Sequence, residues 1–203
     1  IHGEGVAVII VERYEISTGA VERIDRAQVP INLAREGVIL WVDVRQPDKK
    51  ELDWLRDTFH FHPLAMEDIS KHQQRAKLDR YPDYYFLVMH AIEYDEETRE
   101  VRSHEIDLFI NRMYLVSVHD VELPGLNEAH HRLEEAHLPA ETTAFLTYLI
   151  LDAVVDYYFP VVDSMGDLID ELDVATLEQP DRETLQTIFR LRRSLLLARK
   201  QIA

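Results

Sequence analysis

The chain has 203 residues, of which 46% are hydrophobic, so it is long enough and apolar enough to bury the core of a folded domain. Its 38 acidic and 22 basic residues give a formal net charge of −16, which argues against nucleic acid as a partner and favours cations. The chain contains no cysteine, which excludes disulfide bonds and thiolate metal sites.

Strand signals open the chain. Apolar runs at residues 5–17 and 20–24 flank Thr18 and Gly19 and predict a β-hairpin. The continuous apolar run at 38–44 is typical of a strand that is covered on both faces. A sheet with helices packed on it is therefore expected.

Helices and further strands alternate up to about residue 138. Three segments have the apolar spacing of helices, at 48–59, 63–70 and 124–136. Strand signals return in three more segments, at 83–95, 105–111 and 113–120. Strands mixed with helices in this way indicate an α/β sandwich, which we assign to residues 1–138.

The remainder of the chain reads as helix. One long helix is predicted from Glu141 to about Glu178 within an acidic region at 139–180, and a second helix occupies 181–203. A 38-residue helix would be about 57 Å long. A compact domain of this size is only about 35–40 Å across, so we expect the helix to overhang the domain or to bend at Pro160. The second helix shows no stop signal, and we expect the chain to be cut inside it.

Neither a targeting segment nor a membrane span is expected in the chain. Residues 1–10 lack a basic start followed by an apolar run. The longest stretch without charge or histidine is TTAFLTYLIL at 142–151, whereas a spanning helix needs about 20 residues.

The long helix is unusual in the sign of its charge. Residues 141–180 contain nine acidic residues and neither Lys nor Arg. Six aspartates fall on one side of the helix, at positions 152, 156, 163, 167, 170 and 173. This acidic face is either plainly solvated or binds a hydrated hard cation such as Mg²⁺. The final helix carries a net charge of +4 and could pair with the acidic helix or a neighbouring subunit, or be solvated.

Catalytic motifs are missing from the sequence. There is no Gly-x-Ser-x-Gly elbow, no Gly-rich phosphate loop and no His-Glu-x-x-His, so we expect that the protein is not an enzyme. Zinc could be held by His60 with His62, or by His130 and His131 with His137, but surface histidines explain these positions better. The adjacent Glu67 and Asp68 could act as an acid and base only inside a shaped pocket.

Three segments together resemble the cytoplasmic part of the CorA-type divalent-cation transporters. They are FHFHPLAMEDISKHQQRAKLDRYPDYYFLVMHAI, LTYLILDAVVDYYFPVVDSMGDLIDELD and LRRSLLLARKQI, and the resemblance runs from about Trp41 to the end of the chain. It implies an αβα sandwich with a mixed sheet, followed by an acidic helix and a truncated stalk helix. It also implies a homopentamer attached to the inner or plasma membrane through two later spans that this chain lacks.

The resemblance also implies metal sites. Asp68 matches a carboxylate that holds a regulatory divalent ion between subunits, and Glu67 and Asp152 match carboxylates of a second ion site. Asp156 of the acidic face completes our candidate set. The expected ion is Mg²⁺, with Co²⁺ or Zn²⁺ as alternatives, and its binding would hold the closed state of the channel. The family often has Arg-Pro-Lys where this chain has Arg75, Ala76 and Lys77, which removes no ligand.

Two alternatives stay open at this stage. The same domain could belong to a zinc transporter of the ZntB-like branch, because the pore signature that would separate the branches is not in the chain. A stand-alone acidic protein that binds cations or acts as a scaffold is the alternative from a different class.

Overall fold

The computed structural model describes residues 7–71, 74–135, 142–178 and 181–202. Its centre is a seven-stranded mixed sheet with the order β2-β1-β3-β7-β6-β5-β4. The strands are β1 (Val8–Glu15), β2 (Ala20–Arg23), β3 (Val38–Arg45), β4 (Lys77–Arg80), β5 (Tyr85–Asp95), β6 (Glu100–Ile110) and β7 (Tyr114–His119). Within this sheet β3 and β7 run parallel, and the other neighbouring strands are antiparallel.

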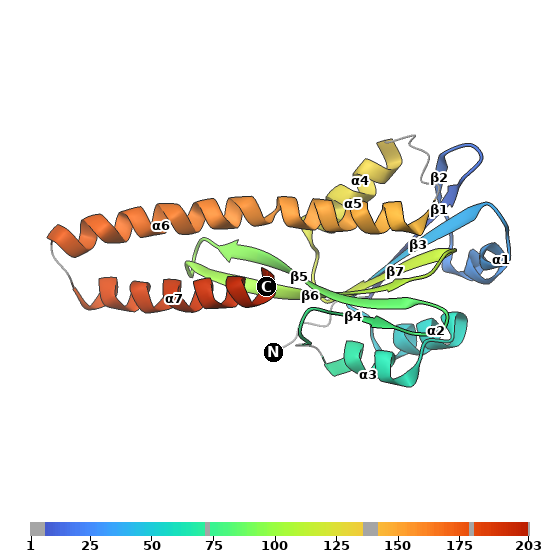
Figure 1. Cartoon of the computed structure of the whole chain (residues 1–203), viewed down its shortest axis with the longest axis horizontal. Helices are drawn as coiled ribbons and strands as arrows, with labels where there is room; N and C mark the ends of the chain where they lie inside the picture. The colour runs from blue at the N-terminus through green and yellow to red at the C-terminus, as the bar shows by residue number, and fades with distance from the viewer. Residues whose placement is uncertain (1–6, 72–73, 136–141, 179–180, 203) are drawn as a thin grey trace.

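Helices cover both faces of the sheet, which confirms the αβα sandwich (Figure 1). The helices are α1 (Val29–Leu33), α2 (Lys49–Phe59), α3 (Pro63–Lys71), α4 (Pro124–Glu135), α5 (Thr143–Asp156), α6 (Tyr158–Glu178) and α7 (Arg182–Ile202). One apolar cluster joins β3 to α2 and α3, and a second cluster joins the other face to α4 and α5. We call these the α2/α3 face and the α4/α5 face of the sheet.

Local sequence signals explain where the elements begin and end. Asp48 caps α2 by accepting hydrogen bonds from the backbone N–H groups of Lys50 and Glu51, and the Glu51 side chain accepts one from Asp48 in return. His60 ends α2 in the left-handed region, with φ of 56°. In β3 every residue from Val38 to Val44 is buried, as expected for a strand covered on both faces.

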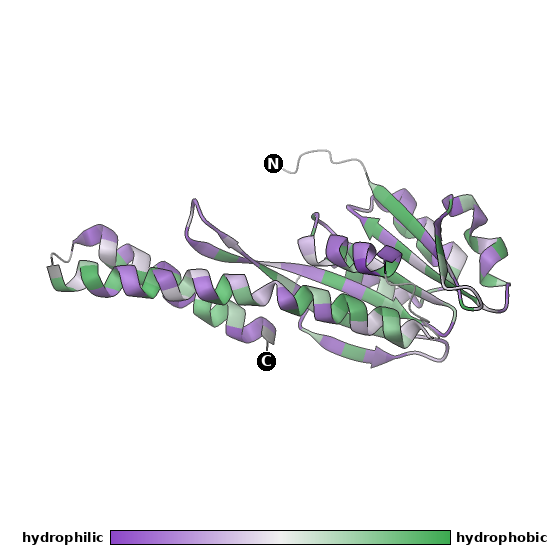
Figure 2. Ribbon diagram, turned by 90° about the horizontal axis from the view of Figure 1, so that it is seen from above, coloured by the Kyte–Doolittle hydropathy of each residue, from purple (hydrophilic) through white to green (hydrophobic). Residues whose placement is uncertain are grey.

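A helical pair projects from the end of the sandwich. Helices α6 and α7 run side by side, and the β5–β6 hairpin packs against both of them (Figure 1). A third apolar cluster fills this interface, with Ile92 and Val101 from the hairpin and Met165, Leu168 and Leu191 from the helices. Figure 2 shows how hydrophobic and hydrophilic residues alternate along α6, which turns its apolar side to this cluster and its aspartates to solvent.

The long helix predicted from Glu141 to about Glu178 is confirmed as a stretch of 35 residues, Thr143–Leu177, with one interruption near the predicted bend at Pro160. Glu141 itself lies outside the described residues. The segment is divided into α5 and α6 at Tyr157, although the two helices follow one another in nearly the same direction (Figure 1). The cause is Pro160, which has no N–H to donate to the carbonyl of Asp156 and whose ring crowds that carbonyl. Beyond this point α6 overhangs the sheet, as its length predicted.

By length and composition alone, the stretch Thr143–Leu177 is long and apolar enough to cross a membrane. In its most apolar segment of 18 residues, 33% of the residues are buried. In the fold, its first part is a layer of the sandwich. Leu146, Ile150 and Ala153 are almost fully buried in the cluster on the α4/α5 face. Much of the hydrophobicity of this stretch is thus used in packing against the sheet.

Candidate functional site

Two of the predicted metal ligands lie on α3, where each is paired with a lysine of the same chain. Glu67 forms an ion pair with Lys71, one helical turn later. Lys77 of β4 donates to Asp68 at 2.6 Å and also lies 2.8 Å from Asp79. Partial burial opposes protonation of Lys77, but its bonds to Asp68 and Asp79 outweigh this effect and raise its pKa. The Asp68 carboxylate is therefore compensated by a fixed positive charge.

The other two predicted ligands lie on α5 and share one arginine. Arg132 of α4 contacts Asp152 at 3.0 Å and Asp156 at 2.9 Å, and it also bonds Glu128 at 2.8 Å. The bonds to Glu128 and Asp156 raise the pKa of the Arg132 guanidinium. This ion-pair group ties α4 to α5, so Asp152 and Asp156 have a structural role in the single chain.

The four predicted ligands do not meet within one chain. Helix α3 lies on one face of the sheet and α5 on the other, so Glu67 and Asp152 are separated by the sheet (Figure 1). Among the described residues, no group of three or more His, Asp or Glu side chains is arranged to hold a metal ion. All four side chains offer carboxylate oxygens, the donor type that Mg²⁺ prefers, but a shared site would need a second subunit.

The histidine expectations are partly wrong. His62 is exposed as expected, and its Nδ1 accepts a hydrogen bond from the N–H of Leu64 at 3.2 Å at the start of α3. His90, His119 and His130 are buried rather than on the surface, with 4–5% of each residue exposed. His131 is exposed as expected, and His137 lies outside the described residues.

A buried network of charged side chains under α4 was not predicted from the sequence. His130 of α4 donates from Nδ1 to Glu12 of β1 at 2.9 Å, and its Nε2 lies 3.4 Å from Asp43 of β3. His119 of β7 approaches the same carboxylate, with Nε2 3.1 Å from Oδ1 of Asp43. The Trp41 ring stacks on His130 with a centroid separation of 3.7 Å. The network fastens α4 to three adjacent strands of the sheet, β1, β3 and β7.

The charges of this network depend on one another. Burial disfavours ionisation of Asp43, but hydrogen bonds from His119 and His130 outweigh it and hold the pKa of Asp43 well below its usual range. Burial likewise disfavours the charged form of His130, but its bonds to Asp43 and Glu12 raise its pKa to about 9. His130 is therefore a buried imidazolium at neutral pH.

The raised pKa of His130 predicts a pH dependence of stability. An unfolded histidine has a pKa of about 6.5, so the folded state retains a proton that the unfolded state releases between this pH and about 9. The stabilisation is fully present below about pH 6.5 and is lost as the pH rises through 9. Urea unfolding at a series of pH values, together with the ring resonances of His130, would measure it. A midpoint near 6.5 for His130 would contradict the predicted charge.

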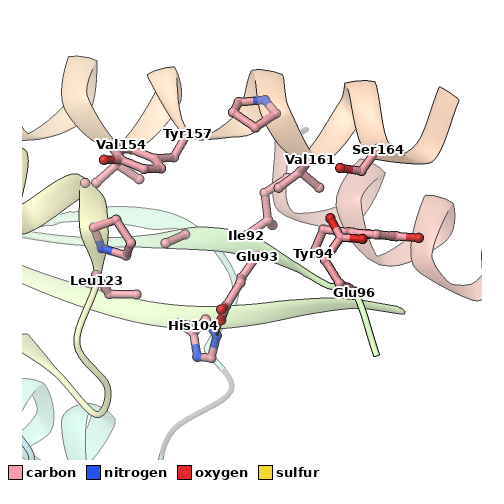
Figure 3. A pocket seen from close by; sticks show the side chains of 14 residues that line it. Ile92, Glu93, Tyr94, Glu96, His104, Leu123, Val154, Tyr157, Val161 and Ser164 are labelled. Carbon is pink, nitrogen blue, oxygen red and sulfur yellow. Dashed lines mark hydrogen bonds and ion pairs between the residues drawn. The ribbon is translucent and has the colours of Figure 1, made fainter. Parts of the chain in front are cut away.

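A pocket of about 210 Å³ lies beneath the junction of α5 and α6 (Figure 3). Val154, Tyr157 and Val161 point into it from the helices, and the β5–β6 hairpin contributes Glu93 and His104, which pair at 3.1 Å. None of the four predicted metal ligands lines this pocket. Its lining combines apolar side chains with the hydrogen-bonded Glu93 and His104 and with Tyr94, Glu96 and Ser164.

The fold and the candidate site together define a class: an acidic αβα domain with a projecting helical pair, which carries surface carboxylates suited to cations. A family model described as "CorA-like Mg2+ transporter protein" matches residues 36–203. The chain belongs to this family. Because the family consists of transporters, the match confirms the expectation that the protein is not an enzyme.

Individual relatives agree with this assignment. The chain is 37% identical to the putative metal ion transporter YfjQ of Bacillus subtilis over 163 residues, which cover 80% of this chain and 50% of YfjQ. It is 32% identical to the cobalt/magnesium transport protein CorA of Thermotoga maritima over 148 residues, or 71% of this chain and 42% of the relative. The chain thus spans about half the length of the curated relatives it matches.

The fold has a solved counterpart. The soluble domain of CorA from Methanocaldococcus jannaschii superposes with a TM-score of 0.76 at 19% identity, covering 97% of this chain and 76% of that domain. The likeness confirms the sandwich and the projecting helices.

Proposed function

We propose that this chain is the cytoplasmic domain of a CorA-type channel for Mg²⁺ and Co²⁺ in the inner or plasma membrane, and that it senses the internal concentration of divalent cations. Membership of the transporter family carries the proposal. Further support comes from the cobalt/magnesium transport protein of Thermotoga maritima, which this chain resembles at 32% identity while covering 42% of its length.

The sensing mechanism follows from the positions of the four carboxylates. Asp68 binds a divalent ion at a boundary between subunits, and Glu67 shares a second ion with Asp152 and Asp156 of a neighbour. Glu67 and Asp152 lie on opposite faces of one chain. Because one chain does not bring these side chains together, the proposal places the ions between copies of the chain in a homopentamer. Two carboxylates roughly 6 Å apart repel by about 3 kcal/mol at an effective dielectric of 20. Internal Mg²⁺ cancels this repulsion and stabilises the closed assembly, and its loss opens the channel.

Without a divalent ion, the four candidate carboxylates are paired with basic side chains of the same chain. Lys77 pairs with Asp68, and Arg132 is shared by Asp152, Asp156 and Glu128, so an incoming cation competes with a basic side chain for these carboxylates. This competition lowers the affinity for the ion, which suits a sensor that must release Mg²⁺ when its concentration falls.

Two substitutions at the Asp68 pair are expected to have opposite effects. Asp68→Asn removes a ligand and should reduce the rise in melting temperature that MgCl₂ produces, because a ligand stabilises the state that binds it. Lys77→Met leaves the carboxylates of Asp68 and Asp79 without their counter-charge and should increase that rise. Differential scanning fluorimetry over a range of MgCl₂ concentrations measures both.

The corresponding test of gating uses a full-length assembly that contains this domain. Asp68→Asn should weaken the inhibition of ion flux by internal Mg²⁺, and Asp57→Asn, at an exposed carboxylate of α2 outside the acidic face, serves as the control. Equal inhibition in wild type and Asp68→Asn would contradict the assignment of Asp68. Transport of Zn²⁺ that internal Mg²⁺ does not inhibit would favour the zinc transporter alternative.

A further inference from the structure

A second cluster of buried polar groups lies between β5, β6 and the C-terminal end of α7. These groups line a pocket of about 380 Å³, to which α7 contributes Leu197 and Lys200. His90 of β5 and Glu105 of β6 are direct partners in the strand register, so their side chains lie next to each other on one face of the sheet. Ser103 and Asp107 flank Glu105 on the same face of β6.

The cluster contains an unusual number of polar atoms without partners. Eight buried side-chain atoms among the described residues have no hydrogen-bond partner. Three of them belong to residues that line this pocket, and a fourth belongs to Asp107, two residues along β6 from Glu105. These four atoms are Nδ1 of His90, Oγ of Ser103, Oε1 of Glu105 and Oδ1 of Asp107. Only 4% of His90 and 3% of Asp107 is exposed. Buried polar atoms are nearly always hydrogen-bonded in folded proteins, so this grouping points to a ligand.

The backbone of Gln74 fixes the orientation of both central side chains. Its carbonyl accepts a hydrogen bond from Nε2 of His90 at 3.1 Å, and its N–H donates to Oε2 of Glu105 at 2.6 Å. The His90 ring therefore carries its proton on Nε2 and presents the lone pair of Nδ1. Histidines that bind metals typically have their second nitrogen anchored in this way.

The local charges favour a cation in the pocket. Because Nε2 of His90 donates its proton to the carbonyl of Gln74, the ring leaves the lone pair of Nδ1 without a partner. Glu105 and Asp120 both contribute carboxyl groups to the lining of the pocket. Lys200 contributes the basic group of the lining. A divalent ion would relieve the repulsion among the carboxyl groups.

We propose that this pocket binds one divalent transition-metal ion through Nδ1 of His90 and Oε1 of Glu105, with water in the remaining positions. The site is open, because no three His, Asp or Glu side chains surround one point among the described residues. One imidazole nitrogen and one carboxylate oxygen suit Co²⁺ or Zn²⁺ better than Mg²⁺. Its two ligands, His90 and Glu105, are not among the four carboxylates of the proposed function.

Titration of the 203-residue chain with CoCl₂ in the presence of excess MgCl₂ tests the proposal, because Mg²⁺ occupies sites made only of oxygen. We expect Co²⁺ to bind with a ligand-field spectrum that indicates a nitrogen ligand. Glu105→Gln and His90→Gln should each raise the Kd at least about tenfold. His131→Gln, which changes an exposed histidine on α4, should leave the Kd unchanged.

A second measurement does not depend on the folding of any variant. When ZnCl₂ is added to the wild-type chain, the Nδ1 resonance of His90 should shift while its Nε2–H is retained. The proposal is overturned if Zn²⁺ moves the resonances of other histidines and not those of His90. It is equally overturned if folded Glu105→Gln binds Co²⁺ as tightly as the wild-type chain.

Discussion

Replacing His130 by alanine is expected to lower the free energy of unfolding by about 3–5 kcal/mol, because two buried carboxylates lose their shared cation. Glu12 and Asp43 are 1% and 5% exposed, and both face His130 across the space between α4 and the sheet. The Trp41 ring also loses its stacking partner. Urea denaturation followed by circular dichroism measures the change.

The next residue in the chain provides the matched control. His131 has a side chain that is 60% exposed and pairs with Glu135 on the outer surface of α4. His131→Ala should therefore change the free energy of unfolding by no more than about 0.5 kcal/mol. If His130→Ala is as mild as His131→Ala, the buried network does not fasten α4 as described.

The second large effect is expected from adding a single methyl group at Gly125. A Cβ atom at this position, in the first turn of α4, would lie 2.9 Å from Cα and 3.1 Å from Cγ2 of Val154 on α5. The nearest obstacle is backbone, so α4 and α5 would have to move apart. Gly125→Ala is expected to destabilise the fold by about 1–3 kcal/mol, the usual range for overpacking, in thermal or urea unfolding.

Gly166, in the middle of α6, provides the matched control for Gly125→Ala. No atom lies within 4 Å of the Cβ position there. Gly166→Ala should stabilise α6 by about 0.5–1 kcal/mol, because alanine loses less backbone freedom in a helix. If Gly125→Ala lowers the free energy of unfolding and Gly166→Ala raises it, the close contact of α4 with α5 is established. If Gly125→Ala leaves the free energy of unfolding unchanged, the result argues against that contact.

The sequence predicted the larger elements because their patterns are long and regular. The buried run at 38–44 became β3, and the capping signal at Asp48 became the start of α2. Strand β4 was missed, since Lys77–Arg80 has only one apolar residue, Leu78, and lies at the edge of the sheet. Helix α1 is a five-residue helix, too short to give a periodic signal.

The candidate site was predicted less completely, for a physical reason. Adjacent histidines such as His130 and His131 point about 100° apart on a helix, so one is buried and the other is exposed. Which of them meets Glu12, 118 positions away, depends on how α4 packs on the sheet. The same holds for Lys77 at Asp68, because the pairing is created by the edge strand that the sequence did not reveal.

The parallel pairing of β3 with β7 also determines when the protein can fold. Leu40 pairs with Tyr114, so the sheet cannot be joined across its middle until more than half of the chain has left the ribosome. Closing so long a loop is slow compared with forming the local hairpins β1–β2 and β5–β6. Until then the apolar edge of β3 is open to other nascent chains. Slowing or stalling translation between these two strands should therefore increase aggregation more than the same delay after β7.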